Sequence, residues 1–313
     1  MPRVSISMPA YNAGRFISEA IESCLSQSLT DFELLIHDDG STDNTLEIAR
    51  SYEAKDPRIR VTTSTNCGAA VTRNKLIDAS QGEYVAVQDA DDVSLPARLE
   101  LQVQFLDAHP DHVLVGGQIE WMEEDGLVIG PVHTVLNHED IEARHLQLDC
   151  RMAHTTVMMR RNALQKVGGY DHDFAYAEDF DLWLRLGEVG KLANLPQAVA
   201  RYRLVGSSLS SLYHPLQVRD AWRALNAAKT RRGLEIDPHE SAPAPNGEPL
   251  QRASWRRTIQ FGWIAWGAGR RQSWRHFALR ALREAPNQPA SWRLLVVGAF
   301  KRPPGGAQNT APD

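Results

Sequence analysis

Short apolar runs alternate with amphipathic segments over the first hundred residues. Runs of β-branched and apolar residues predict strands, and apolar residues recurring every three or four positions predict helices. Strands are predicted at residues 4–8, 32–37, 59–63 and 84–87, and helices at about 16–26, 45–52, 69–79 and 96–109. This alternation predicts βαβ units, and therefore an α/β fold with a mostly parallel central sheet and helices on both faces.

The alternation of predicted strands and helices becomes less regular after a fifth predicted strand at residues 113–118. Residues 120–149 are acidic and contain several histidines, which favours an excursion over the surface. Further on, a strand is predicted at 155–160, a short helix at 162–167 and a helix that begins at Asp179. We therefore expect a first domain over residues 1–215, a helical Arg/Trp-rich extension over 216–301 and a disordered tail over 302–313.

Polar residues follow the predicted strands, with PAYN after the first, DDGST after the second and DADD after the fourth. In open α/β sheets, ligands bind outside the carboxyl ends of the strands. Asp89 and Asp91 are two positions apart, so both can point to the same side of an extended run. Converging carboxylates favour a cation, and their hard oxygens suit Mg²⁺ or Mn²⁺. Taken alone, an acidic turn facing water explains the DADD segment as well.

Composition and charge narrow the class of protein. The chain has 313 residues, a net charge of −5 and three cysteines, Cys24, Cys67 and Cys150, in no paired spacing. We expect no nucleic-acid partner from this charge and no disulfide framework or zinc site from these cysteines. The N-terminus lacks the pattern of a signal peptide, and no apolar stretch reaches the roughly 18 residues of a membrane span. The cytoplasm is therefore the expected compartment.

Four motifs in sequence order resemble the nucleotide-sugar half of the family two GT-A glycosyltransferases. They are Pro9-Ala10-Tyr11-Asn12, Asp38-Asp39-Gly40-Ser41, the segment at 66–74 and Asp89-Ala90-Asp91-Asp92. The segments at 154–157, 168–171 and 177–183 extend the resemblance to about two-thirds of the chain. It implies a GT-A fold and metal-dependent, inverting transfer of a sugar from a nucleotide-diphospho-sugar, expected to be a UDP-sugar, to an acceptor hydroxyl. It also implies a place in bacterial cell-surface polysaccharide or lipopolysaccharide biosynthesis, with a glycan or lipid-linked acceptor.

The resemblance also implies roles for single residues. It assigns the nucleotide-sugar to Pro9, Ala10, Tyr11, Asp39, Arg73, Asp89 and Asp91. Asp91 would also hold the divalent metal, Mn²⁺ or Mg²⁺. An acceptor hydroxyl needs a base at neutral pH, and this role falls to Asp179, with Glu178 contacting the acceptor or the sugar. His154 would lie on the acceptor side.

Structural interpretations of the same residues stay open at this point. They are core packing for Tyr11, a turn cap for Asp39, a surface ion pair for Arg73, helix N-terminal charges for Glu178 and Asp179, and a structural role for His154.

One position departs from the family pattern. Many relatives carry a metal-binding histidine three residues after the tyrosine of a YRxHxxSxS segment, where this chain has Val205 after Tyr202. A metal would then depend on Asp91, the diphosphate and water, or on a nearby residue such as His214. Val205 also leaves room for an inactive nucleotide-sugar-binding or scaffold protein. The other alternative is a different nucleotide-sugar enzyme, although the chain has no glycine-rich phosphate loop.

The C-terminal part is basic and rich in tryptophan. Residues 251–302 contain eleven Arg and Lys residues, and Glu284 is the one acid. Arginine and tryptophan on amphipathic helices favour an anionic membrane surface as a partner, so the protein is peripheral to the inner membrane face in this interpretation. In the alternative, the helices pack on the acidic catalytic domain with the tryptophans as their core.

Overall fold

The computed structural model of the protein describes residues 1–205, 214–236, 242–243, 254–301 and 303. Two compact units can be separated. The first comprises Met1–Ile119, His133–Tyr202 and Tyr213–Gly247, and the second comprises Glu120–Val132, Arg203–Leu212 and Glu248–Asp313. Except for Pro303, the predicted tail at 302–313 lies outside the described residues, as do residues 206–210 of the segment that follows Val205.

Four parallel strands and the helices between them form the first half of unit 1, as the sequence predicts. The elements are β1 (Val4–Ala10), α1 (Ile17–Leu25), β2 (Phe32–Asp38), α2 (Thr45–Glu53), β3 (Ile59–Thr63), α3 (Ala69–Ala79) and β4 (Tyr84–Val87). The strands lie in the order β3-β2-β1-β4. The chain therefore moves outward from β1 to β3 and returns to the other side of β1, which makes the carboxyl ends of β1 and β4 a topological switch point.

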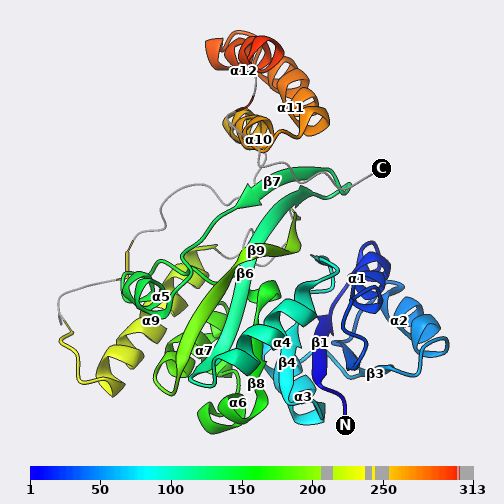
Figure 1. Ribbon diagram of the computed structural model, residues 1–313, viewed down its shortest axis with the longest axis vertical. Coiled ribbons are helices and arrows are strands. Elements are labelled where there is room, and N and C mark those ends of the chain that lie inside the picture. The colour runs from blue at the N-terminus through cyan, green and yellow to red at the C-terminus, as the bar shows by residue number, and fades with distance from the viewer. Residues whose placement is uncertain (206–213, 237–241, 244–253, 302, 304–313) are drawn as a thin grey trace. The chain divides into compact units, whose positions relative to one another are not determined.

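Antiparallel strands continue the sheet beyond β4. The strands are β5 (Val93–Ser94), β6 (His112–Glu123), β7 (Val128–Val132), β8 (Met158–Arg160) and β9 (Lys191–Leu204), and the sheet order is β3-β2-β1-β4-β8-β6-β9-β5 with β7 on β6. The helices are α4 (Arg98–Ala108), α5 (His138–His145), α6 (Arg161–Val167), α7 (Glu178–Gly187) and α9 (His214–Arg231), with 3₁₀ turns η1 (His154–Thr156) and η2 (His172–Phe174). Figure 1 follows this path from blue β1 to green β9.

No secondary structure is assigned from the sequence to the predicted surface excursion over residues 120–149, but the structure has regular elements there. Strand β6 continues to Glu123 and turns into β7, and α5 follows within the same segment. At the end of β6, residues on both faces are at least half-buried, and Met122 is fully buried, so its apolar and polar residues do not alternate clearly. Local patterning detects such a strand poorly. The predicted strand at 155–160 is also shorter, because η1 occupies its beginning.

Helices cover both faces of the sheet. Tyr84 and Ala86 of β4 belong to a buried cluster with residues of α1, α2 and α4. Val85 and Val87 belong to a second cluster with residues of α3, α6 and α7. Alternate residues of a strand point to opposite faces, so β4 is buried on both sides and its carboxyl end is held firmly in place.

The second unit contains α10 (Trp255–Gly267), α11 (Arg271–Glu284) and α12 (Pro289–Phe300), the orange and red helices of Figure 1. The acidic end of β6, from Glu120 onward, belongs to the same unit and pairs with basic residues of its helical part. Glu120 pairs with Arg270, and Glu123 pairs with Arg280 at 2.7 Å. Among the described residues, no helix is both long enough and apolar enough to span a bilayer.

Candidate active site

Asp39 lies directly after β2 and organises the loop that follows β3. Its buried carboxylate accepts backbone hydrogen bonds from Cys67 at 2.9 Å and Gly68 at 3.0 Å. Gly40 has a φ of 75°, and a Cβ there would lie 2.8 Å from the backbone nitrogen of Asn66. The close approach of the two loops therefore requires glycine at this position. A carboxylate has about four acceptor sites, so Asp39 retains capacity toward a ligand.

The loop after β1 joins the same edge of the sheet. The backbone N–H of Asp39 donates to the carbonyl of Ala10 at 2.8 Å, and the N–H of Asn12 donates to the Ser41 hydroxyl at 2.9 Å. Tyr11 is 53% exposed, so the core-packing interpretation of its ring is wrong. The exposed ring is free to stack on a planar ligand.

A charged cluster forms where β4 ends and α7 begins. Arg73 of α3 donates to Glu178 at 2.9 Å and to Asp89 at 3.2 Å. His154 Nδ1 lies 3.6 Å from the other Asp89 oxygen, and its Nε2 lies 2.9 Å from the Tyr170 hydroxyl. We call these five residues the charge cluster. Arg73 lies in a buried ion pair rather than a surface one, and His154 lies beside Asp89.

Burial and neighbouring charges set the protonation states in the charge cluster. Burial alone would raise the pKa of Asp89, but the hydrogen bond and charge of His154, together with Arg73, hold this pKa well below its usual range. Burial raises the pKa of Glu178, although the charge of Arg73 opposes the shift. Burial also raises the pKa of the Tyr170 hydroxyl, which therefore stays protonated. Asp89 is thus the firmly ionised carboxylate of the two that contact Arg73.

Three acidic residues at the start of α7 have different surroundings. Glu178 is buried against Arg73, and Asp181 is buried in an ion pair with Arg185. Asp179 is half-buried, and its Oδ1 accepts a 2.7 Å hydrogen bond from the backbone N–H of Phe180. Asp179 is therefore the acid of this turn that keeps a carboxylate oxygen accessible to an incoming molecule.

Asp91 follows β4 and is half-buried, whereas Asp92 is buried in the turn. Within the described ranges, no group of three or more His, Cys, Asp or Glu side chains is arranged to hold a metal ion. Val205 is described and nearly buried. His214 is the first residue of α9, and its side chain lies outside what the structure describes.

The structure brings the predicted residues to one edge of the sheet, and it adds neighbours that the motifs did not single out. Cys67 Sγ lies 3.2 Å from the Asp39 carboxylate, and Tyr170 completes the charge cluster. Gln88 donates its amide N–H groups to the carbonyls of Asp89 and Asp92 at 2.9 Å each. The sequence signal for Cys67 and Tyr170 was their position inside the motif segments, and for Gln88 its position directly before Asp89, but no role followed from these positions.

Comparison with known proteins identifies the family. The model described as "Glycosyl transferase family 2" matches residues 5–168, more than half of the chain. This chain belongs to glycosyl transferase family 2. Among similar proteins, the Bacillus subtilis protein EpsE, named as a glycosyltransferase, has 38% identity over 207 residues that cover 64% of this chain and 73% of EpsE. An uncharacterised glycosyltransferase of Haemophilus influenzae is 31% identical over 223 residues, which cover 68% of this chain and 69% of that protein.

Solved structures agree with the family assignment at the level of the fold. S. aureus TarS, residues 1–349, superposes with a TM-score of 0.58 and 19% identity, covering 95% of this chain and 81% of that chain. The mannosyltransferase PcManGT from Pyrobaculum calidifontis was solved with GDP-Man and Mn²⁺. It superposes with a TM-score of 0.56 and 19% identity, covering 95% of this chain and 79% of that chain. The predicted GT-A fold is confirmed.

Proposed function

We propose that this family 2 glycosyltransferase transfers a sugar from a UDP-sugar to an acceptor hydroxyl with inversion, assisted by a divalent metal ion. The arrangement that carries the proposal is the edge of the sheet at the switch point, where Tyr11 and Asp39 lie on one side and the charge cluster on the other. TarS has been solved with UDP and with UDP-GlcNAc, which favours a uridine nucleotide, whereas the PcManGT complex contains GDP-Man.

On the donor side, the loops that end β1 and β2 would bind the nucleoside. Pro9 and Ala10 end β1, Tyr11 offers an exposed ring and Asp39 offers acceptor capacity toward an N–H or a ribose hydroxyl. Arg73 would stabilise the negative charge of the diphosphate, and it is already oriented by Asp89 and Glu178. Because these groups are fixed before the ligand arrives, little reorganisation accompanies binding.

The divalent metal would be held by Asp91. A half-buried carboxylate at a strand end is a hard oxygen ligand, which fits Mn²⁺ or Mg²⁺. Such an ion neutralises charge on the leaving diphosphate. With Val205 in the usual histidine position, its further ligands would come from the nucleotide diphosphate and water, so metal and nucleotide would bind together.

On the acceptor side, Asp179 would be the base. Its carboxylate is accessible, whereas Glu178 is committed to Arg73 and Asp181 to Arg185. Inversion follows from a single in-line displacement. The acceptor oxygen attacks the anomeric carbon as its proton passes to Asp179, and the bond from that carbon to the diphosphate breaks, so that UDP leaves from the opposite side. His154 would support this side of the site through Tyr170 and Asp89.

The biological setting is a further part of the proposal. TuaG of Bacillus subtilis, named for teichuronic acid biosynthesis, is 34% identical over 215 residues, which cover 67% of this chain and 82% of TuaG. We infer a glycan or lipid-linked acceptor in cell-surface polysaccharide synthesis, and a cytoplasmic location peripheral to the membrane.

Nucleotide and metal binding can be tested by thermal unfolding. UDP with Mn²⁺ is expected to raise the melting temperature by several degrees, and either component alone by much less, since a ligand that binds the folded state stabilises it. EDTA should abolish the added shift. GDP and AMP at the same concentration are the matched controls. No shift with any nucleotide-sugar, with or without Mn²⁺, would contradict the transferase proposal, whereas binding without turnover would favour the inactive scaffold.

Alkylation of Cys67 provides a second test of the donor side. Cys67 is exposed, and its sulfur contacts Asp39 and lies 3.2 Å from Lys75 Nζ. The test uses a Cys150→Ser background. UDP with Mn²⁺ at about 100 times its Kd should slow N-ethylmaleimide labelling of Cys67 about 100-fold, because only the fraction of protein without bound nucleotide is then labelled. Peptide mass spectrometry measures the rate, and AMP is the control. Unchanged labelling under conditions that produce the thermal shift would place the nucleotide elsewhere.

A further inference from the structure

An exposed apolar stripe runs along α12 in the second unit. Trp292, Val296 and Phe300 are four positions apart, so they share one face of the helix. They are 53%, 50% and 86% exposed. On α11, Leu279 is also 51% exposed. Four of the nine large apolar side chains exposed in the described part of the chain thus belong to these two helices, and such clustering marks a contact surface.

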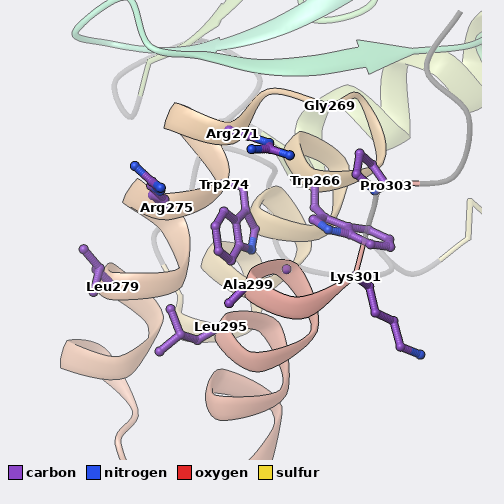
Figure 2. A pocket seen from close by; sticks show the side chains of 11 residues that line it. Trp266, Gly269, Arg271, Trp274, Arg275, Leu279, Leu295, Ala299, Lys301 and Pro303 are labelled. Carbon is purple, nitrogen blue, oxygen red and sulfur yellow. The ribbon is translucent and has the colours of Figure 1, made fainter.

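A cavity of about 410 Å³ opens in the same helices. Its apolar lining comes mainly from Trp266, Trp274 and Leu295. The indole of Trp274 lies between α11 and α12 (Figure 2). Its N–H donates to the Leu294 carbonyl at 3.2 Å. The ring fits there because position 298 is glycine, since a Cβ at that residue would lie 2.1 Å from the indole. The structure therefore forms a rigid aromatic wall in this cavity.

Positive charge accompanies these apolar surfaces. Arg271, Arg275 and Lys301 line the cavity and are exposed, and within the described residues none has an acidic partner. By contrast, Arg270, which directly precedes α11, and Arg280 of α11 pair with Glu120 and Glu123 at the end of β6. Arg270 and Arg280 thus stabilise the unit through ion pairs, whereas the charges of Arg271, Arg275 and Lys301 are available to a partner.

We propose that the exposed surface of α11 and α12 docks onto an anionic phospholipid membrane. Trp292, Val296 and Phe300 would enter the interface between headgroups and acyl chains, and Arg271, Arg275 and Lys301 would bind headgroup phosphates. Exposed apolar side chains next to cations are the combination that interfacial helices use, and each cation near an anionic leaflet adds to the attraction. The inference refines the proposed peripheral location and is independent of the transfer chemistry.

Two other occupants fit this face less well. A second copy of the chain would bring the same unpaired cations against one another across a symmetric interface, and like charges repel. Nucleic acid would satisfy the cations but leave the apolar side chains of α12 without a partner, because its outer surface is phosphate and sugar. An anionic bilayer complements both the charge and the apolar stripe.

Vesicle flotation with the full chain tests the proposal. Vesicles of phosphatidylcholine with about 40 mol% phosphatidylglycerol should bind the protein at least about tenfold more tightly than pure phosphatidylcholine, and high salt should reduce this difference. Arg271→Glu/Arg275→Glu should lower binding to the anionic vesicles about tenfold or more. Val296→Ser/Phe300→Ser should lower binding at every salt concentration. Lys55→Glu/Lys166→Glu, which makes the same change in net charge on exposed residues of unit 1, is the matched control and should bind within about twofold of the parent.

Other outcomes would overturn the proposal. These are equal binding to both vesicle types, loss of binding in the control variant equal to that in the arginine variant, or release by inorganic phosphate at constant ionic strength. A dimer in solution that the α12 variant converts to a monomer, without a change in vesicle binding, would identify the face as a self-interface. Each variant should keep the parent's thermal shift with UDP and Mn²⁺, so failure at the membrane is distinguishable from failure of the donor site.

Discussion

Asp179→Asn is expected to lower the turnover number about 10²–10⁴-fold while leaving nucleotide binding intact. The carboxylate is accessible at the start of α7, and its neighbours Glu178 and Asp181 are occupied by Arg73 and Arg185. Asparagine keeps the size and the backbone contact of the side chain but cannot take a proton at neutral pH. Transfer to an acceptor, followed by chromatography of the released UDP, measures the effect.

Two comparisons separate a base from a merely structural acid. Asp173→Asn removes a carboxylate from the exposed turn η2 nearby and should leave the rate within about twofold, since exposed substitutions of this kind have small effects. The thermal shift with UDP and Mn²⁺ should be unchanged in Asp179→Asn. A full transfer rate in Asp179→Asn would show that another group accepts the proton.

Arg98→Met is expected to destabilise the fold by about 3 kcal/mol or more and to weaken metal–nucleotide binding. Arg98 is fully buried beneath the loop that carries Asp89 and Asp91. Its guanidinium donates to the carbonyls of Val87 and Val157 and to the side chains of Gln88, Ser94 and Gln102. Methionine fills much of the volume but leaves these acceptors without a donor, and unsatisfied buried polar groups are costly.

The effect on binding has a separate physical cause. Gln88 accepts from Arg98 and donates to the carbonyls of Asp89 and Asp92, so Arg98 acts as a positioning residue for the loop. Burial lowers the pKa of the guanidinium to about 10, against the raising effect of Cys24 and of the carboxylates at Asp89 and Asp92. Removing this cation from water is costly, but its N–H groups all donate hydrogen bonds. Such an arrangement is typical of a fixed polar network.

Denaturant unfolding and Mn²⁺·UDP titration measure the two consequences of Arg98→Met. Arg144→Met, a half-exposed arginine of α5 paired with Asp149, is the matched control and should cost at most about 1 kcal/mol. A purely structural role for Arg98 would shift the unfolding midpoint and leave the nucleotide Kd unchanged under folded conditions. An unchanged unfolding midpoint in Arg98→Met would contradict the proposal that the Arg98 hydrogen-bond network stabilises the fold.

The strength of the local patterns explains which elements the sequence predicted well. The helix at 69–79 and the strand at 59–63 match the structure to the residue, because each has a clear period and clear breaks. β1 extends two residues beyond its predicted end, through Pro9 to Ala10, since pairing with β2 continues there despite the proline. The long strand β9 had no local signal strong enough to be predicted.

The sequence by itself determined the family, the parallel first half and the candidate residues at the strand ends, because hydrophobic period and motif order are local properties of the chain. The tertiary structure decided which candidates meet. Arg73 and Glu178 are 105 positions apart, and they form an ion pair because β8 inserts antiparallel beside β4 and brings the segment from η1 to α7 to the same edge of the sheet. It also decided that the tryptophans divide between core and surface, with Trp274 buried and Trp292 exposed. Burial depends on contacts between distant segments, and no local pattern encodes those contacts.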